Sequence, residues 1–120
     1  MPSRPRAVPA WLLVLVLTIT LSGCRGGPGE GAADAPPVTG VTEVVGKDLR
    51  FQPPAIQVEA GTEVTWRFED GSVPHNVKGD GFASKDQTKG TFAHRFGQPG
   101  EYRYTCTLHA GMDGRVVVTG

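Results

Sequence analysis

From Val38 onward, hydrophobic and polar residues alternate in short segments that turn signals separate. Val64, Trp66 and Phe68 alternate with polar neighbours, which is the pattern of a strand with one buried face. The same pattern, or a run of β-branched residues, predicts further strands at 38–45, 56–59, 92–96, 102–106 and 115–119. Residues 79–90 are rich in Gly, Lys and Asp, and they are predicted to form a loop or a brief helical turn.

Short antiparallel strands without a helical segment predict an all-β fold, a β-sandwich or a barrel. The folded part has only a thin core, so large side chains must supply most of its bulk. His94 lies in the middle of a predicted strand and is expected to have a structural role and not to bind a metal. The residues expected to fill the core are Phe51, Trp66, Phe68, Phe82, Phe92, Phe96, Tyr102 and Tyr104.

Residues 1–23 are predicted to be a secretory signal and not part of the fold. Arg4 and Arg6 precede an uncharged apolar run at 10–21, which is too short to span a bilayer comfortably. The run ends in Leu-Ser-Gly-Cys, and this resembles the bacterial lipobox, in which cleavage leaves an amino-terminal Cys that carries a lipid. The resemblance implies lipidation of Cys24. The alternative is an ordinary signal peptide with an incidental Cys.

After the signal, residues 24–37 are predicted to be a lipid-anchored Cys and a flexible linker, and residues 38–120 a folded domain. The linker holds Gly, Pro and Ala but no larger aliphatic residue, so it cannot bury a core. Fully extended, it would reach roughly 45 Å. We therefore expect an exported, extracytoplasmic domain tethered to a bacterial membrane.

The charge balance gives little reason to expect a nucleic-acid partner. The whole chain has 12 basic and 12 acidic residues, and residues 25–120 keep 10 of the basic and all 12 of the acidic ones, a net charge of −2. No basic block or stripe is present, so nucleic-acid binding is not expected.

The two cysteines of the chain are predicted to have different fates. If Cys24 is acylated, Cys106 is left alone in an oxidising compartment, where a bare thiol is open to oxidation. A bound metal would protect it. A disulfide between the two cysteines is the alternative.

Three sulfur and nitrogen donors are close together near the C-terminus: Cys106, His109 and Met112. They fall in a short loop between two predicted strands, where they can converge on one point. His75 is the candidate for one more ligand, and Pro74 restrains the backbone before it. A thiolate, two imidazoles and a thioether suit copper, whereas structural zinc prefers four Cys or His ligands, and calcium prefers oxygen.

Together, Pro-His-Asn at 74–76 and Cys-x-x-His-x-x-Met at 106–112 resemble the cupredoxins of the plastocyanin and amicyanin type. The resemblance covers roughly residues 45–120. It implies a Greek-key β-sandwich of about eight strands with one copper ion at one end. The implied ligands are His75, Cys106 and His109, with Met112 as a weak axial ligand.

The resemblance also implies a supporting layer around the ligands. Asn76 would point its backbone N–H at the Cys106 sulfur and tie its side chain to the loop at Thr107. Leu108 departs from the family, which usually has Pro at this position. Glu69 and Asp70, adjacent carboxylates after a predicted strand, are expected to be solvated.

The predicted function is one-electron transfer by a blue copper centre, with redox proteins as partners, the exposed edge of His109 as the electron port and a monomeric state. No nucleophile pair, general base or open coordination position is evident, so the chain is not expected to be an enzyme. Three alternatives stay open: a copper carrier, an accessory that feeds electrons to one oxidase or reductase, and a copper-free interaction domain.

Overall fold

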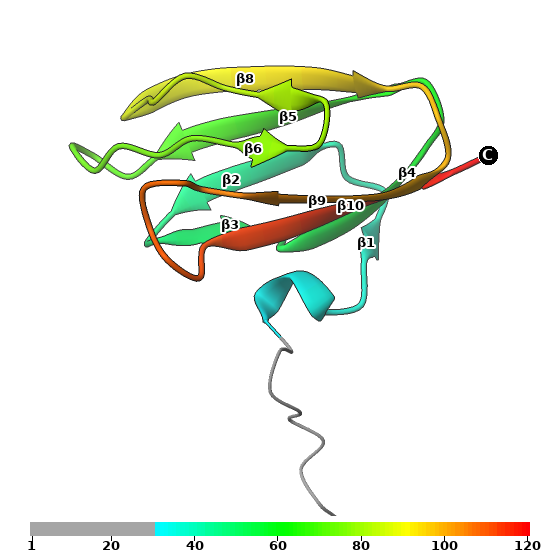
Figure 1. Cartoon of the computed structure of the whole chain (residues 1–120), viewed down its shortest axis with the longest axis horizontal. Coiled ribbons are helices and arrows are strands. Elements are labelled where there is room, and N and C mark those ends of the chain that lie inside the picture. Colours follow the sequence, from blue (N-terminus) through cyan, green and yellow to red (C-terminus); the bar gives the residue numbers. More distant parts are fainter. Residues whose placement is uncertain (1–30) are drawn as a thin grey trace, which may run out of the picture.

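Two β-sheets packed face to face make up the fold, and a short 3₁₀ helix precedes the first strand (Figure 1). The computed structural model describes residues 31–120. Within that range, no helix is long and apolar enough to cross a membrane. The elements are η1 (Ala32–Asp34), β1 (Val38–Thr39), β2 (Glu43–Lys47), β3 (Arg50–Gln52), β4 (Ala55–Glu59), β5 (Thr62–Glu69), β6 (Lys78–Gly79), β7 (Phe82–Ala83), β8 (Lys89–Phe96), β9 (Gly100–Thr105) and β10 (Asp113–Thr119).

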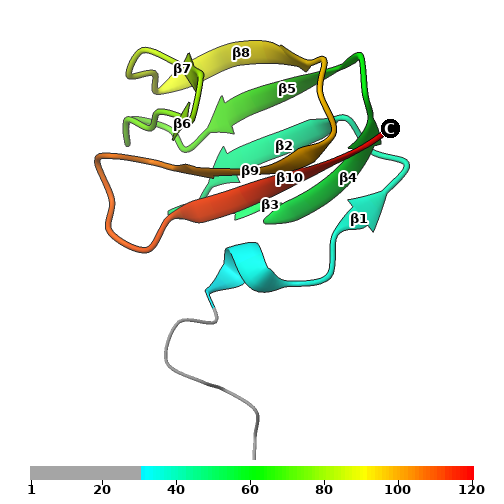
Figure 2. The same cartoon turned by 45° about the vertical axis from the view of Figure 1, so that its right-hand side comes forward.

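The larger sheet has the strand order β1-β4-β10-β9-β6-β7, and the smaller has the order β3-β2-β5-β8. Strand β10 pairs parallel with β4 and antiparallel with β9. Both cartoon views place the β5–β6 and β9–β10 loops at the same end of the sandwich (Figure 1, Figure 2). The predicted all-β sandwich is confirmed. The described part of the chain has ten strands where about eight were predicted. Three of the ten, β1, β6 and β7, are only two residues long.

The predicted strand at 38–45 is wrong as a single element. Gly40 adopts a φ of 79°, in the left-handed region that glycine tolerates, and the chain changes direction there. β1 then pairs with β4 in the larger sheet, whereas β2 pairs with β3 and β5 in the smaller one. One run of β-branched residues therefore contributes to both layers.

The loop predicted at 79–90 is also partly wrong. Lys78 and Gly79 pair with Phe82 and Ala83 to form a small hairpin at the edge of the larger sheet. The Phe82 ring covers Gly79, where a Cβ would lie 2.2 Å from its Cζ atom. A glycine at that position thus leaves room for an aromatic side chain to close the core.

Trp66 lies at the centre of the core and is fully buried. Its ring centroid is 5.2 Å from that of Tyr104, 5.6 Å from that of Phe92 and 5.8 Å from that of Phe82. Such contacts add to the large apolar area that each ring buries. All the aromatic residues predicted for the core belong to it or pack against it.

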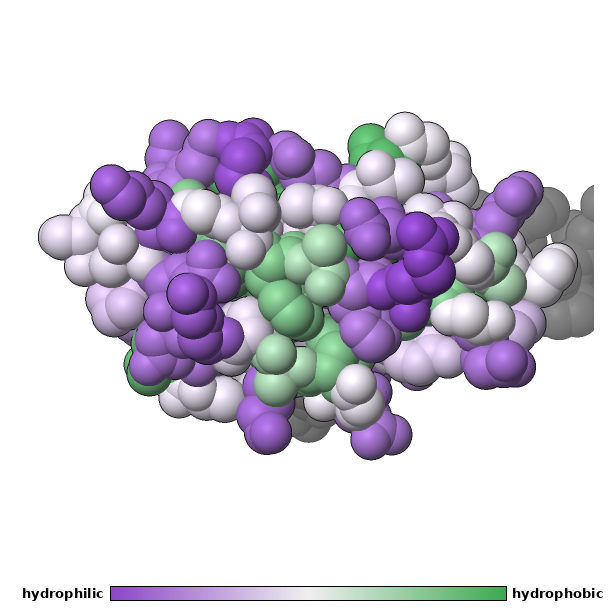
Figure 3. Space-filling view, turned by 90° about the horizontal axis from the view of Figure 1, so that it is seen from above, coloured by the Kyte–Doolittle hydropathy of each residue, from purple (hydrophilic) through white to green (hydrophobic). Residues whose placement is uncertain are grey.

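Edge strand β8 leaves part of this aromatic layer accessible. Phe92 and His94 are half-buried there, and the His94 ring stacks on Phe82 at a centroid distance of 4.9 Å, which is a structural contact. Seen from the side of β8, apolar side chains form a strip across the middle of the surface, with polar residues on both sides (Figure 3).

Residues 31–35 pack on the larger sheet instead of extending away from it. Ala33 of η1 is buried, and η1 contacts β10 and β4. Asp34 pairs with Arg103 of β9, and Arg115 Nη2 donates to the carbonyl of Ala35 at 2.9 Å. Residues 31–35, which belong to the linker predicted at 24–37, therefore contact the domain. Residues 24–30 of this linker lie outside the described part, as does the predicted signal at 1–23.

Candidate metal centre

His75, Cys106 and His109 meet at one end of the sandwich. One donor atom from each lies within 4.8 Å of the other two. His75 follows β5 on the connection to β6, whereas Cys106 and His109 belong to the loop between β9 and β10. The sequence placed these three residues in one site, and the structure brings them together. His75 and Cys106 are buried, and His109 is half-buried.

The β9–β10 loop is closed by its own backbone. The Cys106 N–H donates to the Met112 carbonyl at 2.9 Å, and the Met112 N–H donates to the His109 carbonyl at 3.3 Å. Gly111 takes a φ of 81°, which lets the chain turn back so sharply. Thr105 adds a hydroxyl bond to the Met112 carbonyl at 3.3 Å. These bonds fix the backbone positions from which the donor side chains extend.

His75 is held on the other side by an isolated β-bridge. Its N–H donates to the Gln87 carbonyl at 2.9 Å, and its carbonyl accepts from the Gln87 N–H at 2.8 Å. Pro74 precedes it and restricts the backbone at that point. The backbone of His75 is thus fixed although it lies outside the named strands.

Asn76 ties the two loops together. Its Nδ2 donates to Thr107 Oγ1 at 2.6 Å and to Asp86 Oδ1 at 2.8 Å, while its Oδ1 accepts from the Thr107 N–H at 2.8 Å. The side-chain bond predicted between Asn76 and the loop at Thr107 is present. The other expectation, a backbone N–H of Asn76 aimed at the Cys106 sulfur, stays a prediction.

Both imidazoles are oriented by oxygen acceptors. His109 Nε2 lies 2.8 Å from the carbonyl of Pro74, and His75 Nε2 lies 2.8 Å from Asp70 Oδ2. A carbonyl and an ionised carboxylate only accept, so Nε2 carries the hydrogen in both rings. In a neutral imidazole the lone pair is then on Nδ1. In His75 this atom lies 4.0 Å from Cys106 Sγ.

Asp70 is the residue that the sequence analysis missed, because it was expected to be solvated. Its hydrogen bond from His75 lowers the pKa of the carboxyl most; partial burial opposes this, and the N–H groups of Asp48 and Leu49 lower the pKa further. The sequence offers one indication of this contact: Asp70 lies five positions before the predicted ligand His75, across a loop that contains Gly71.

Met112 closes the β9–β10 loop that carries Cys106 and His109, and it is buried, with 1% of its surface exposed. Its side chain reaches toward β2, where a Cβ at Gly46 would lie 3.8 Å from Met112 Cε and 3.0 Å from Phe68 Cδ1. Gly46 therefore leaves room for the Phe68 ring, and Met112 Cε lies within van der Waals distance of the same point. The predicted role of Met112 as a weak axial ligand stays a prediction.

The surface around the centre is partly apolar. Leu108, at the position where the family usually has Pro, is 42% exposed beside the half-buried His109. Ala110 and Gly111 are exposed and small. Cys106 has no disulfide partner among residues 31–120, and Cys24 lies outside them.

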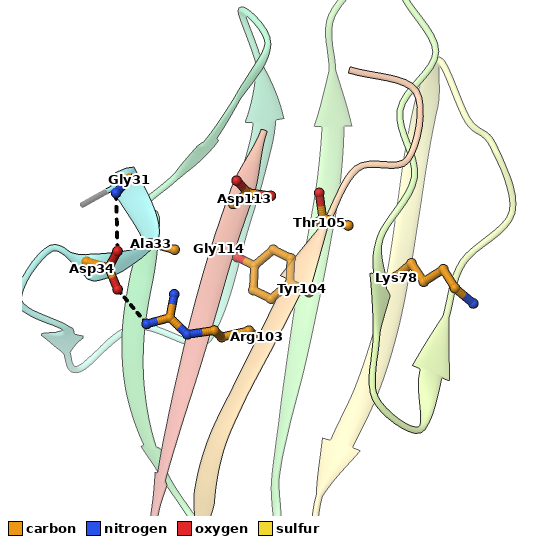
Figure 4. A pocket seen from close by; sticks show the side chains of 9 residues that line it. All are labelled: Gly31, Ala33, Asp34, Lys78, Arg103, Tyr104, Thr105, Asp113 and Gly114. Carbon is orange, nitrogen blue, oxygen red and sulfur yellow. Dashed lines mark hydrogen bonds and ion pairs between the residues drawn. The ribbon is translucent and has the colours of Figure 1, made fainter. Parts of the chain in front are cut away.

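A separate cavity of about 280 Å³ lies between η1 and the outer part of the larger sheet (Figure 4). The Asp34–Arg103 pair crosses it, and none of the donor residues lines it. It is the space left where residues 31–35 dock on the domain, not part of the donor cluster.

Comparison with known proteins agrees with this donor set. The family model of copper-binding proteins of the plastocyanin/azurin family matches residues 38–119. Amicyanin-alpha of Methylorubrum extorquens is 37% identical over 97 residues, covering 74% of this chain and 79% of that protein. Amicyanin of Paracoccus versutus is 35% identical over 96 residues, covering 72% of this chain and 70% of that protein.

Among solved structures, a purple cupredoxin from Nitrosopumilus maritimus superimposes with a TM-score of 0.60 at 28% identity, covering 66% of this chain and all of that one. Two imidazole nitrogens and one thiolate, with a buried thioether beside them, are the donors that copper electron-transfer sites use. The donor chemistry therefore fits a copper ion. From the family match, the relatives and this fit, the chain belongs to the plastocyanin/azurin family of copper-binding proteins.

Proposed function

We propose that this protein is a blue copper electron carrier that exchanges single electrons with redox partner proteins. The observation that carries the proposal is the group of His75, Cys106 and His109, whose donor atoms lie within 4.8 Å of one another at one end of the sandwich. Met112, which is buried and closes the same loop as Cys106 and His109, would be the weak fourth ligand. Bound copper would supply a one-electron couple between Cu(I) and Cu(II).

The contribution of the protein is to keep these donors still. The His75 backbone is bridged to Gln87, the Cys106–Met112 loop is closed by its own hydrogen bonds, and Asn76 joins the two segments. Ligands that do not move when the charge changes keep the reorganisation energy small, which favours fast electron transfer. The apolar core behind Met112 excludes water from the buried side.

Electrons would enter and leave through the half-buried His109. Leu108, Ala110 and Gly111 surround it with apolar or small side chains, so a partner surface can approach closely. Copper bound by His75, Cys106 and His109 would occupy the thiol and both imidazoles of the site, and we assign it no catalytic reaction.

Adding Cu(II) to the purified protein is the direct test. We expect one equivalent to give an intense blue colour and a reversible one-electron reduction, because a thiolate and two imidazoles would bind the ion. Visible absorption and voltammetry report the two results. A colourless one-to-one complex would contradict the electron-carrier proposal and favour a copper carrier.

The proposal extends to the location of the protein. Residues 1–23 would direct export, and a lipid on Cys24 would hold the copper domain at the outer surface of a bacterial membrane. The lipobox-like sequence at 21–24 supports this part, together with the apolar run before it. Because residues 31–35 contact the larger sheet, the free part of the tether would be shorter than residues 24–37.

Replacing Cys24 with alanine should release the protein from the membrane. Without the thiol no lipid can be attached, and no membrane-spanning helix is found among residues 31–120 to retain it. Membrane fractionation followed by immunodetection measures the distribution. Cys106→Ala is the matched control and should stay in the membrane fraction; retention of Cys24→Ala there would show that lipid on Cys24 is not the anchor.

A further inference from the structure

We propose that Asp70 is a positioning residue of the copper centre, which fixes the ring of His75 and lowers the reduction potential of the bound ion. The inference rests on the proposed function, since it concerns the same centre. It assigns to an acidic side chain after β5 a role that a solvated carboxylate would not have.

Asp70 contacts the ring of His75 directly. Asp70 Oδ2 lies 2.8 Å from His75 Nε2, and His75 is completely buried while the Asp70 side chain is 16% exposed. Water competes little for a bond in such a place, so both its strength and its direction are preserved. Because the carboxylate only accepts, it requires the hydrogen on Nε2 and leaves the Nδ1 lone pair facing the Cys106 sulfur.

Asp70 is itself held in place by the turn between β2 and β3. The main-chain N–H of Leu49 lies 3.5 Å from the same carboxylate oxygen. Asp48 and Leu49 form the two-residue turn between β2 and β3, and their φ values are 53° and 57°. Left-handed conformations at both positions define the tight hairpin turn that Asn-Gly usually supplies, and leucine adopts them at a cost.

Packing does not explain this conformation, because Leu49 is 51% exposed. The turn does bring its N–H groups against Asp70, where an ionised acceptor forms stronger hydrogen bonds than a neutral one. A chain of contacts thus runs from the β2–β3 turn through the carboxylate to His75.

The Asp70 carboxylate would also change how strongly His75 donates electrons to the ion. A carboxylate on Nε2–H makes an imidazole a stronger donor, and this stabilises the more highly charged Cu(II) over Cu(I). His109 provides the internal contrast, because its Nε2 faces the neutral carbonyl of Pro74. The two imidazoles are therefore unequal donors, and the buried one is the stronger.

The matched variants are Asp70→Asn and Glu69→Gln. Each removes one negative charge, but Glu69 is exposed and pairs with Arg67 instead of a histidine. For Asp70→Asn we expect the preference for Cu(II) over Cu(I) to fall about tenfold, which raises the potential by ~59 mV. For Glu69→Gln we expect a much smaller shift. Equal shifts, or none in Asp70→Asn, would overturn the assignment.

A second measurement needs no copper. Nitrogen-15 NMR of the metal-free protein reports which ring nitrogen of His75 is protonated. We expect Nε2–H alone in the wild type and in Asp70→Asn, whose amide oxygen still accepts, and a mixture of tautomers in Asp70→Ala. A mixture in the wild type would refute the positioning role.

The two proposals fail separately. If the wild type takes up Cu(II) without turning blue, the electron-carrier function fails, while the NMR result on the metal-free protein still decides the orientation of His75. If the wild type is blue and the potential of Asp70→Asn is unchanged, the function stands and the tuning role of Asp70 is wrong.

Discussion

Replacing Cys106 with serine is expected to abolish the blue colour of the copper-loaded protein. The colour requires a thiolate bound to copper, and a serine hydroxyl neither ionises at neutral pH nor offers a soft donor. Cys106 is the one cysteine among residues 31–120 and is 2% exposed, so no other thiol of that range can take its place. Titration with Cu(II), followed by visible absorption and electron paramagnetic resonance, measures the loss.

The same substitution at the other cysteine, Cys24→Ser, is the matched control and should leave the spectrum unchanged. Urea unfolding of metal-free Cys106→Ser checks that the fold survives. Burying a hydroxyl there should cost about 1–3 kcal/mol, which leaves a folded protein. A Cys106→Ser protein that remains intensely blue would exclude this residue as the thiolate ligand.

Trp66→Ala should lower the free energy of unfolding of the metal-free protein by about 3–5 kcal/mol. The indole is fully buried at the centre of the core, and its removal leaves a cavity between the rings of Phe82, Phe92 and Tyr104. Because domains of this size are only marginally stable, such a loss is a large share of the total. Urea denaturation followed by circular dichroism measures it.

Two further variants make this prediction specific. The buried indole N–H of Trp66 has no hydrogen-bond partner among residues 31–120, so Trp66→Phe removes an unpaired donor together with some volume. Its loss of stability should be well under half that of Trp66→Ala. Val38→Ala, at a position 43% exposed, should change stability by about 0.5 kcal/mol or less. Equal losses in Trp66→Ala and Val38→Ala would contradict the central role of the indole.

Much of the sandwich could be predicted from the sequence because, in a strand with one buried face, every second side chain is apolar. Val64, Trp66 and Phe68 are all buried on one face of β5, as their alternation indicated. The donors Cys106, His109 and Met112 could be predicted as one group because a loop of seven residues between two paired strands leaves them little room to separate. These inferences need only local geometry.

The errors arose where distant contacts decide the local structure. The β-branched run at 38–45 indicates extended backbone, but only the positions of β4 and β5 determine that it splits between two sheets at Gly40. The hairpin of β6 and β7 exists because β9 supplies a third strand beside it. Residues 31–35 dock through Arg103 and Arg115, which lie far along the chain.

Asp70 escaped prediction for a related reason. Its contact with His75 spans only five positions, but it depends on the path of the intervening loop and on the turn at Asp48 and Leu49. Acidic residues in loops are usually solvated, so residue type alone favoured the wrong interpretation. The conformation of the β2–β3 turn, with a leucine at positive φ, has no signature in the sequence.

The donors follow strands of two different sheets, and this affects the stability of the fold. His75 lies on the connection that leaves the four-stranded sheet, whereas Cys106 and His109 follow a strand of the six-stranded sheet. An ion bound by all of them would clamp the layers together, and at a free concentration one hundred times its dissociation constant it would add about 2.7 kcal/mol to stability. The concentration of free metal would then determine how much stability the ion adds at this end of the sandwich.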